Sequence, residues 1–178
     1  MTAPVLSVRL PRTIQLDVSD RHIFDEAAEP GEWAVTGTFV FMEDAPEDAM
    51  GKRRTAFQHG FLGTGSFGWS TLVMVADAPP AVVASVTDAL AQHFVERHGA
   101  PSLDAAHEVA AREVAFAASL CEHPVGTLLT IFRQHGPDGI VEQFATVTRD
   151  AAPADAGGPD FGKPFDLLAL AAQPGGGS

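Results

Sequence analysis

Glu113 is the residue whose type and position suggest chemistry most directly. When residues 102–122 are projected at about 100° per residue, the apolar side chains gather on one helix face, and Glu113 falls on that face. Burying a carboxylate without a partner costs several kcal/mol, so the fold must supply a partner, a proton or water. The sequence therefore predicts that Glu113 is either a satisfied buried acid or part of a site.

The two interpretations of Glu113 predict different surroundings. In the structural interpretation the carboxylate pairs with a buried group. The candidate groups are Ser70, Thr71, the Trp69 indole N–H, Arg133 and a backbone N–H. In the functional interpretation Glu113 is a base or ligand anchor whose pKa is raised in an aromatic pocket. The ligand-binding residues predicted for that pocket are Glu113, Trp69, Ser70, Phe67 and Phe116.

The glycine-rich segment 63–68 has the pattern G-x-G-x-x-G, but its surroundings are wrong for a nucleotide site. A dinucleotide fingerprint needs a strand before it and a helix after it, because the helix N-terminus holds the pyrophosphate. Here we expect a helix before and a strand after, so the glycines are predicted to form a tight connection. Ser66 and Ser70 border this region, but neither lies in the G-x-S-x-G elbow of a serine nucleophile. No catalytic residue is predicted.

Cys121 and His123 raise the question of a metal site. A structural zinc site needs about four ligands, usually supplied as close pairs, and Cys121 is the only cysteine of the chain. Cys121 falls on the apolar face of the helix over 102–122, where a cysteine behaves as a small inert hydrophobe. We therefore expect a buried thiol, and we predict no metal and no cofactor. Metal handling through Cys121 and His123 is a minor alternative.

The composition excludes several classes of partner. The chain has 178 residues and a formal charge of −12, from 23 acids against 11 bases. Such a surface repels phosphate backbones and anionic lipids, so we expect neither nucleic acid nor membrane as a partner. The sequence has no run of about 18 apolar residues, so no membrane-spanning helix is predicted. A single cysteine and an N-terminus without signal-peptide features indicate a cytoplasmic protein.

The acidic side chains are concentrated in one stretch. Eight acids and no Lys or Arg lie between Asp25 and Asp48, and three bases, residues 52–54, follow directly. The stretch 25–48 is predicted to be either a solvated face with local ion pairs or a docking surface for a basic partner.

Alternating and helical patterns predict the elements that must position these residues. The predicted strands are 13–17, 22–26, 33–42, 67–75, 127–134 and 140–148, and the predicted helices are 44 to about 59, 80–98 and 102–122. Adjacent strands with hairpin links favour an α+β fold, with a mainly antiparallel sheet of five or six strands and about three helices packed on one face. We expect a single domain over 1–149. Residues 150–178 are predicted to be a flexible Ala/Pro/Gly-rich tail, interrupted by an apolar island at 161–170.

Five phrases of the sequence resemble a known family when they are taken together. They are Arg12-Thr-Ile-Gln-Leu-Asp17, Ala28-Glu-Pro-Gly-Glu-Trp-Ala-Val35, Gly60-Phe-Leu-Gly63, Ser66-Phe-Gly-Trp-Ser-Thr-Leu72 and Glu113-Val-Ala-Phe-Ala-Ala-Ser-Leu-Cys121. The resemblance is to a small family of alphaproteobacterial proteins known only as a domain of unknown function, and it spans roughly 12–149. It implies no activity, cofactor or site residue.

Two functions follow from these patterns. The first is a small cytosolic accessory or protein-binding module without a defined catalytic activity, which binds a partner through the acidic stretch 25–48 or the island 161–170. The alternative is a small-ligand-binding protein or enzyme that uses a buried Glu113 in a pocket near Trp69.

Overall fold

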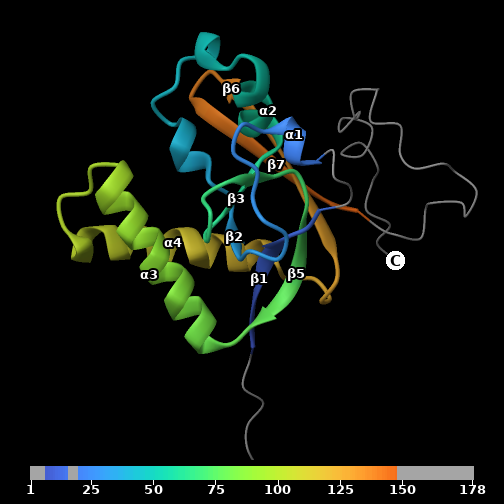
Figure 1. Ribbon diagram of the computed structural model, residues 1–178, viewed down its shortest axis with the longest axis vertical. Coiled ribbons are helices and arrows are strands. Elements are labelled where there is room, and N and C mark those ends of the chain that lie inside the picture. Colours follow the sequence, from blue (N-terminus) through green and yellow to red (C-terminus); the bar gives the residue numbers. More distant parts are fainter. Residues whose placement is uncertain (1–6, 16–19, 148–178) are drawn as a thin grey trace, which may run out of the picture.

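The computed structural model describes residues 7–15 and 20–147 of the chain (Figure 1). The predicted strand 13–17 lies partly outside this region, and within it the prediction is wrong, because the strand there is β1 (Val8–Thr13), which ends at Thr13. The predicted tail 150–178, with its apolar island 161–170, lies outside the described residues altogether.

The larger sheet contains β1 (Val8–Thr13), β5 (Val73–Ala78), β6 (Leu128–Gly136) and β7 (Gly139–Val147). The strand order is β1-β5-β6-β7, and every neighbouring pair is antiparallel. The predicted hairpin is confirmed: β6 and β7 are joined by a two-residue turn and run side by side as the long orange pair of Figure 1. Gly139 has a φ of +127° directly after this turn, which requires glycine.

The smaller sheet contains β2 (Ala34–Val35), β3 (Phe61–Gly63) and β4 (Trp69–Ser70), in that order and all antiparallel. The prediction of one long strand over 33–42 is therefore wrong. Gly37 has a φ of +78°, which takes the chain out of the extended conformation, and the 3₁₀ helix η1 (Thr38–Phe41) follows. A Cβ at Gly37 would lie 2.6 Å from the Leu62 Cβ, so only glycine lets the two segments approach.

Two further strand predictions are corrected. The predicted strand 67–75 divides between the two sheets as β4 and β5, and the Ser70 hydroxyl donates to the Leu72 carbonyl at the break (2.8 Å). The predicted strand 22–26 is replaced by the short helix α1 (Asp20–Ile23). Two consecutive apolar residues, Ile23 and Phe24, do not fit the alternation of a half-buried strand. They fit a turn in which the Phe24 ring is buried.

The two long predicted helices are confirmed as α3 (Pro80–Arg97) and α4 (Leu103–Leu120), which pack against each other (Figure 1). Pro80 opens α3 in its first turn, and the Ser102 hydroxyl caps α4 by accepting a hydrogen bond from the Ala105 N–H (3.1 Å). The helix predicted over 44–59 begins later: a 3₁₀ turn, η2 (Pro46–Asp48), precedes α2 (Gly51–His59).

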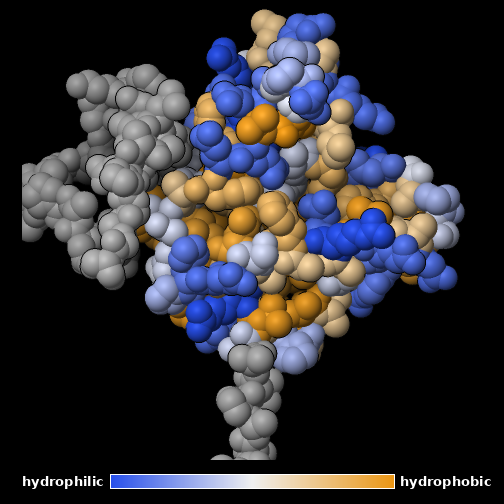
Figure 2. Space-filling model, turned by 180° about the vertical axis from the view of Figure 1, so that it is seen from behind, coloured by the Kyte–Doolittle hydropathy of each residue, from blue (hydrophilic) through white to orange (hydrophobic). Residues whose placement is uncertain are grey.

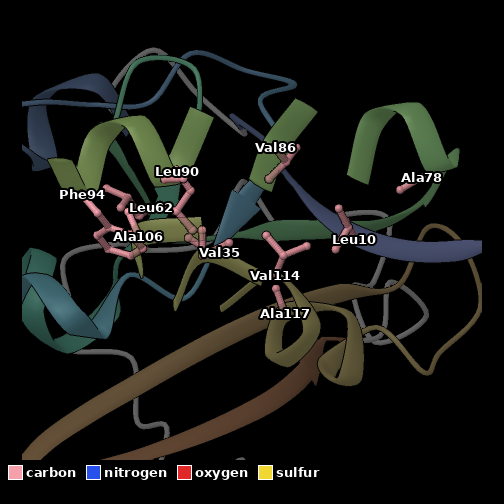
Figure 3. Close-up of a cluster of buried hydrophobic side chains, with 12 residues drawn as sticks. Leu10, Val35, Leu62, Ala78, Val86, Leu90, Phe94, Ala106, Val114 and Ala117 are labelled. Carbon is pink, nitrogen blue, oxygen red and sulfur yellow. The ribbon is translucent and has the colours of Figure 1, made fainter. Parts of the chain in front are cut away.

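The main core lies where α3 and α4 meet strands of both sheets (Figure 3). Small side chains line the inner face of α4 at helical spacing and allow close approach of the helices. The buried core residues are Leu10, Val35, Leu62, Ala78, Val86, Leu90, Ala91, Phe94, Ala106, Ala110, Val114 and Ala117. The α+β class with antiparallel strands is thus confirmed, whereas the strands form two sheets where one was predicted.

Hydrophobic side chains also reach the surface. Figure 2 shows one face of the molecule, on which orange hydrophobic patches lie between blue hydrophilic ones. The large hydrophobic residues with exposed side chains are Val8, Met42, Met50, Val95, Leu103, Val109, Phe116, Val125 and Val141. No helix in the described part of the chain combines the length and apolar character needed to cross a membrane.

Candidate functional site

A cavity of about 540 Å³ lies between η1, α4 and the turn end of the β6–β7 hairpin. Its walls combine apolar side chains with polar ones in similar measure, and the apolar side chains are Phe39, Phe41, Met42, Phe116 and Ile140. Its charged residues are all acids: Asp44, Glu113, Asp138 and Glu142. Volumes of this order hold small organic ligands in other proteins.

The β6–β7 register brings a charged pair to the base of this cavity. Arg133 on β6 lies directly opposite Glu142 on β7, and the Arg133 Nε atom is 3.5 Å from a Glu142 carboxylate oxygen. The pairs on either side of it are Ile131 opposite Phe144 and His135 opposite Ile140. Because side chains alternate along a strand, these three pairs share one face of the hairpin.

The Arg133 guanidinium is completely buried, with an exposed fraction of 0%. Its Nη1 donates to the carbonyls of Phe57 (2.9 Å) and Gly60 (2.8 Å) at the C-terminus of α2. Its Nη2 donates to the Thr36 carbonyl, and its Nε donates to the Thr38 hydroxyl (2.7 Å). Burial lowers the pKa of Arg133 to about 10, which leaves the side chain charged at neutral pH. Arg133 therefore joins α2, η1 and the hairpin through one cation.

Glu142 is held in place from two sides. It pairs with Arg133, and it accepts a hydrogen bond from the Thr38 hydroxyl. Burial raises the pKa of Glu142, while the charge of Arg133 and its hydrogen bond oppose that rise. The carboxylate is thus a fixed part of the cavity floor.

Glu113 reaches the same cavity from α4 without such support. Burial raises the pKa of Glu113, the negative charge of Glu142 raises it further, and the charge of Arg133 lowers it. Within residues 7–15 and 20–147, no ion pair or hydrogen bond holds this carboxylate. A half-buried carboxyl group with a raised pKa can accept a hydrogen bond, balance a positive charge or exchange a proton with a bound molecule.

His135, which also lines the cavity, has a buried ring nitrogen without a hydrogen-bond partner among the described residues. Its ring stacks on Phe57, with ring centres 4.5 Å apart and an interplanar angle of 14°. The buried nitrogen is Nε2. Buried polar atoms in folded proteins are normally paired, so an unpaired one beside a cavity suggests a missing ligand or water.

Residues 8–156 match a family of unknown function, DUF6505. The chain belongs to this family. The DUF6505 match includes the whole cavity, since every lining residue lies between Thr36 and Glu142, and it ends before the island 161–170. This finding confirms the resemblance to a family of unknown function. No curated protein and no solved structure matches the chain.

The DUF6505 structure brings together only two of the five residues predicted for the ligand pocket. Glu113 and Phe116 line the cavity, and the Phe116 ring lies edge-on to Phe144. Trp69 and Ser70 line a separate cavity of only about 20 Å³. Phe67 lies elsewhere again, where its ring stacks on that of His93 with centres 3.7 Å apart. 

Thr38, His135 and Glu142 are among the DUF6505 cavity residues that were not predicted as ligand-binding residues. Arg133 was predicted only as one possible partner of Glu113. The signal that could have found the pair is a charged residue on the apolar face of a strand, as in Ile131-x-Arg133 and in Glu142-x-Phe144.

The glycine-rich segment 63–68 of this DUF6505 protein connects β3 to β4. The strand that follows it was predicted, but strand β3 lies between α2 and the segment, so the connection joins two strands and not a helix to a strand. Its loop binds an acid of the same chain: the backbone N–H groups of Gly65 (2.8 Å) and Ser66 and the Ser66 hydroxyl (2.7 Å) all donate to the Glu32 carboxylate. Consecutive N–H groups of this kind form an anion-binding concavity. Here Glu32 already fills it.

Cys121 is buried next to β5 and β6, and burial raises the pKa of its thiol to about 12. His123 is exposed, and its backbone carbonyl accepts a hydrogen bond from Arg9 (2.7 Å). In the part of the chain that the structure describes, no group of three or more His, Cys, Asp and Glu side chains is placed to hold a metal ion.

Proposed function

We propose that this protein binds a small organic molecule in the cavity between η1, α4 and the β6–β7 hairpin. The observation that carries the proposal is the Glu113 carboxylate, which lines a cavity of about 540 Å³ without any partner from the described chain. A concave site where aromatic side chains and convergent polar groups meet a group of perturbed pKa fits the general pattern of a ligand site.

A purely structural role accounts for Glu142 better than for Glu113. Arg133 directs its guanidinium to backbone carbonyls, Thr38 and Glu142, and no hydrogen bond joins it to Glu113. A second carboxylate near this pair adds repulsion and desolvation cost, both of which raise its pKa. A bound molecule that satisfies Glu113 would offset that cost.

The proposal is tested by screening a fragment library by two-dimensional NMR of the ¹⁵N-labelled protein. Ligands are expected to shift the amide signals of residues 36–44 and 135–142, which enclose the cavity. Phe116→Ala should weaken binding because Phe116 forms part of the wall. The matched control is Val109→Ala on the same helix: its side chain is 43% exposed against 40% for Phe116, but it does not line the cavity. Shifts scattered over the whole surface, unaffected by Phe116→Ala, would refute the proposal.

We propose protein binding through the acidic stretch 25–48 as a second candidate function, in a cytoplasmic accessory protein. Its support is the pair Met42 and Met50, each 74% exposed, beside the exposed acids Glu43 and Glu47. Against it, Glu32 binds the glycine-rich loop and other acids of the stretch form ion pairs within the chain.

The second candidate is tested by affinity capture with the wild-type chain and with the double variant Glu43→Lys/Glu47→Lys. A partner with a basic surface should be retained by the wild type and lost by the variant, because the charge reversal repels it. Equal recovery on both would exclude these acids from the interface.

A further inference from the structure

We infer that the ligand of this cavity carries a positive charge, in the form of a protonated amine or amidine attached to an apolar body. The inference rests on the proposed function and specifies the chemical class of its ligand. It follows from the charges that line the cavity, from their partners and from the chemistry of the walls.

The cavity has an excess of negative charge that the protein does not neutralise. Its lining contains four acids and neither Lys nor Arg. Two of the acids have a cation: Asp44 accepts from Arg53 (2.9 Å), and Glu142 pairs with Arg133. Glu113 and Asp138 have no ion pair among the described residues. A ligand with one positive charge would supply the missing partner.

The two arginines that contact lining residues, Arg53 and Arg133, are both already bound to acids of the protein. Arg133 is fully buried, and all three of its guanidinium nitrogens already donate to groups of the protein. A carboxylate or phosphate entering the cavity would meet Glu113 and Glu142, and it would have to displace Asp44 to pair with Arg53. Anionic metabolites such as nucleotides are therefore excluded by charge.

The walls suit a cation with an apolar body. Phe39 and Phe116 present aromatic surface to the cavity, and the face of an aromatic ring attracts a nearby cation. Phe41 is less available, because Arg53 already lies 5.4 Å from the centre of its ring.

The test compares amines with alcohols of the same shape. The probes are benzylamine, phenethylamine and tryptamine, each paired with its alcohol (benzyl alcohol, 2-phenylethanol and tryptophol), with indole-3-acetate as the anion. Affinities are measured by NMR titration of the full chain. At least one amine is expected to bind about tenfold more tightly than its alcohol, the difference that one partly desolvated ion pair supplies, and indole-3-acetate is expected not to bind.

Variants of α4 connect the preference to Glu113. Glu113→Gln should remove most of the amine preference while alcohol binding is unchanged. Glu108→Gln is the matched control, because Glu108 lies exposed on the same helix away from the cavity. Should amine and alcohol bind equally, or Glu113→Gln leave the preference intact, the inference is overturned and the proposed cavity function stands. Binding of none of the seven compounds to the cavity residues overturns both.

Discussion

Replacing Arg133 by methionine should cost this protein a large part of its stability. Methionine is unbranched and apolar, and it is shorter than arginine. The variant therefore loses the charge and its hydrogen bonds, and it leaves the space of the guanidinium group unfilled. The carbonyls of Thr36, Phe57 and Gly60 would lose their donor, and the Glu142 carboxylate would lose its counter-charge.

The size of the loss follows from these contacts. Removing one member of a buried ion pair typically costs about 3–5 kcal/mol, and each buried acceptor left without a donor costs about 1–3 kcal/mol. These contributions overlap at a single side chain, so we take about 4 kcal/mol as the minimum for Arg133→Met. Folded proteins are stable by only about 5–15 kcal/mol. At about 2–4 °C per kcal/mol for a chain of this size, the Tm should fall by at least about 8 °C.

Urea denaturation followed by tryptophan fluorescence measures this loss, with Arg54→Met as the control. Arg54 is exposed on α2, and its side chain makes no hydrogen bond or ion pair with the described residues, so its replacement should change stability by less than about 0.5 kcal/mol. Adding Glu142→Gln to Arg133→Met should recover part of the loss, because the stranded charge is removed. A loss below about 1 kcal/mol for Arg133→Met would refute the view that this cation joins α2, η1 and the hairpin.

Three further perturbations follow from the structure. Burial raises the pKa of Glu113 above its ordinary value of 4.5, so the folded state binds the proton more tightly than the unfolded state and loses stability as the pH rises above about 4.5. Glu113→Gln should therefore raise the Tm, and by more at about pH 7 than at about pH 4. Glu113→Ala should give a lower Tm than Glu113→Gln. Calorimetry that finds equal, near-zero shifts for both would mean that the carboxylate is simply solvated. Gly37→Ala should destabilise the protein by about 2 kcal/mol more than Gly51→Ala. Both glycines have a positive φ, but only at Gly37 would the new Cβ lie 2.6 Å from the Leu62 Cβ. Equal midpoints of urea unfolding for the two variants would contradict this. The pKa of Cys121 is raised from 9.0 to about 12, so this thiol should form roughly a thousandfold less thiolate than an ordinary cysteine at neutral pH. Labelling with Ellman's reagent should be slow in buffer and fast in guanidinium. Similar labelling rates in both solutions would disprove the burial of Cys121.

The elements with strong periodic patterns could be predicted from the sequence, and those with special backbone geometry could not. The helices α3 and α4 and the β6–β7 hairpin follow from apolar spacing and from Pro80, Ser102 and the turn residues. The predicted strand 33–42 failed at Gly37, whose positive φ reflects close packing against Leu62. Local alternation cannot reveal such a tertiary contact.

The candidate site was predicted only in part for a related reason. The helical projection placed Glu113 and Phe116 on or near the inner side of α4, and both line the cavity. Trp69 was assigned to the same pocket because the segment 67–75 was predicted as one strand, but the chain breaks within it and β4 joins the smaller sheet. The pairing of Arg133 with Glu142 depends on a cross-strand register that no local pattern specifies.

The two-residue turn that joins β6 to β7 controls which side chains face the cavity. Because successive residues of a strand point to opposite sides, an insertion that shifted β7 by one position would turn Glu142 outward and bring Val141 or Gln143 to the cavity in its place. A change of loop length is thus as disruptive to recognition as a substitution of the acid itself. Homologues with a longer turn should differ in ligand preference even where both Arg133 and Glu142 are retained.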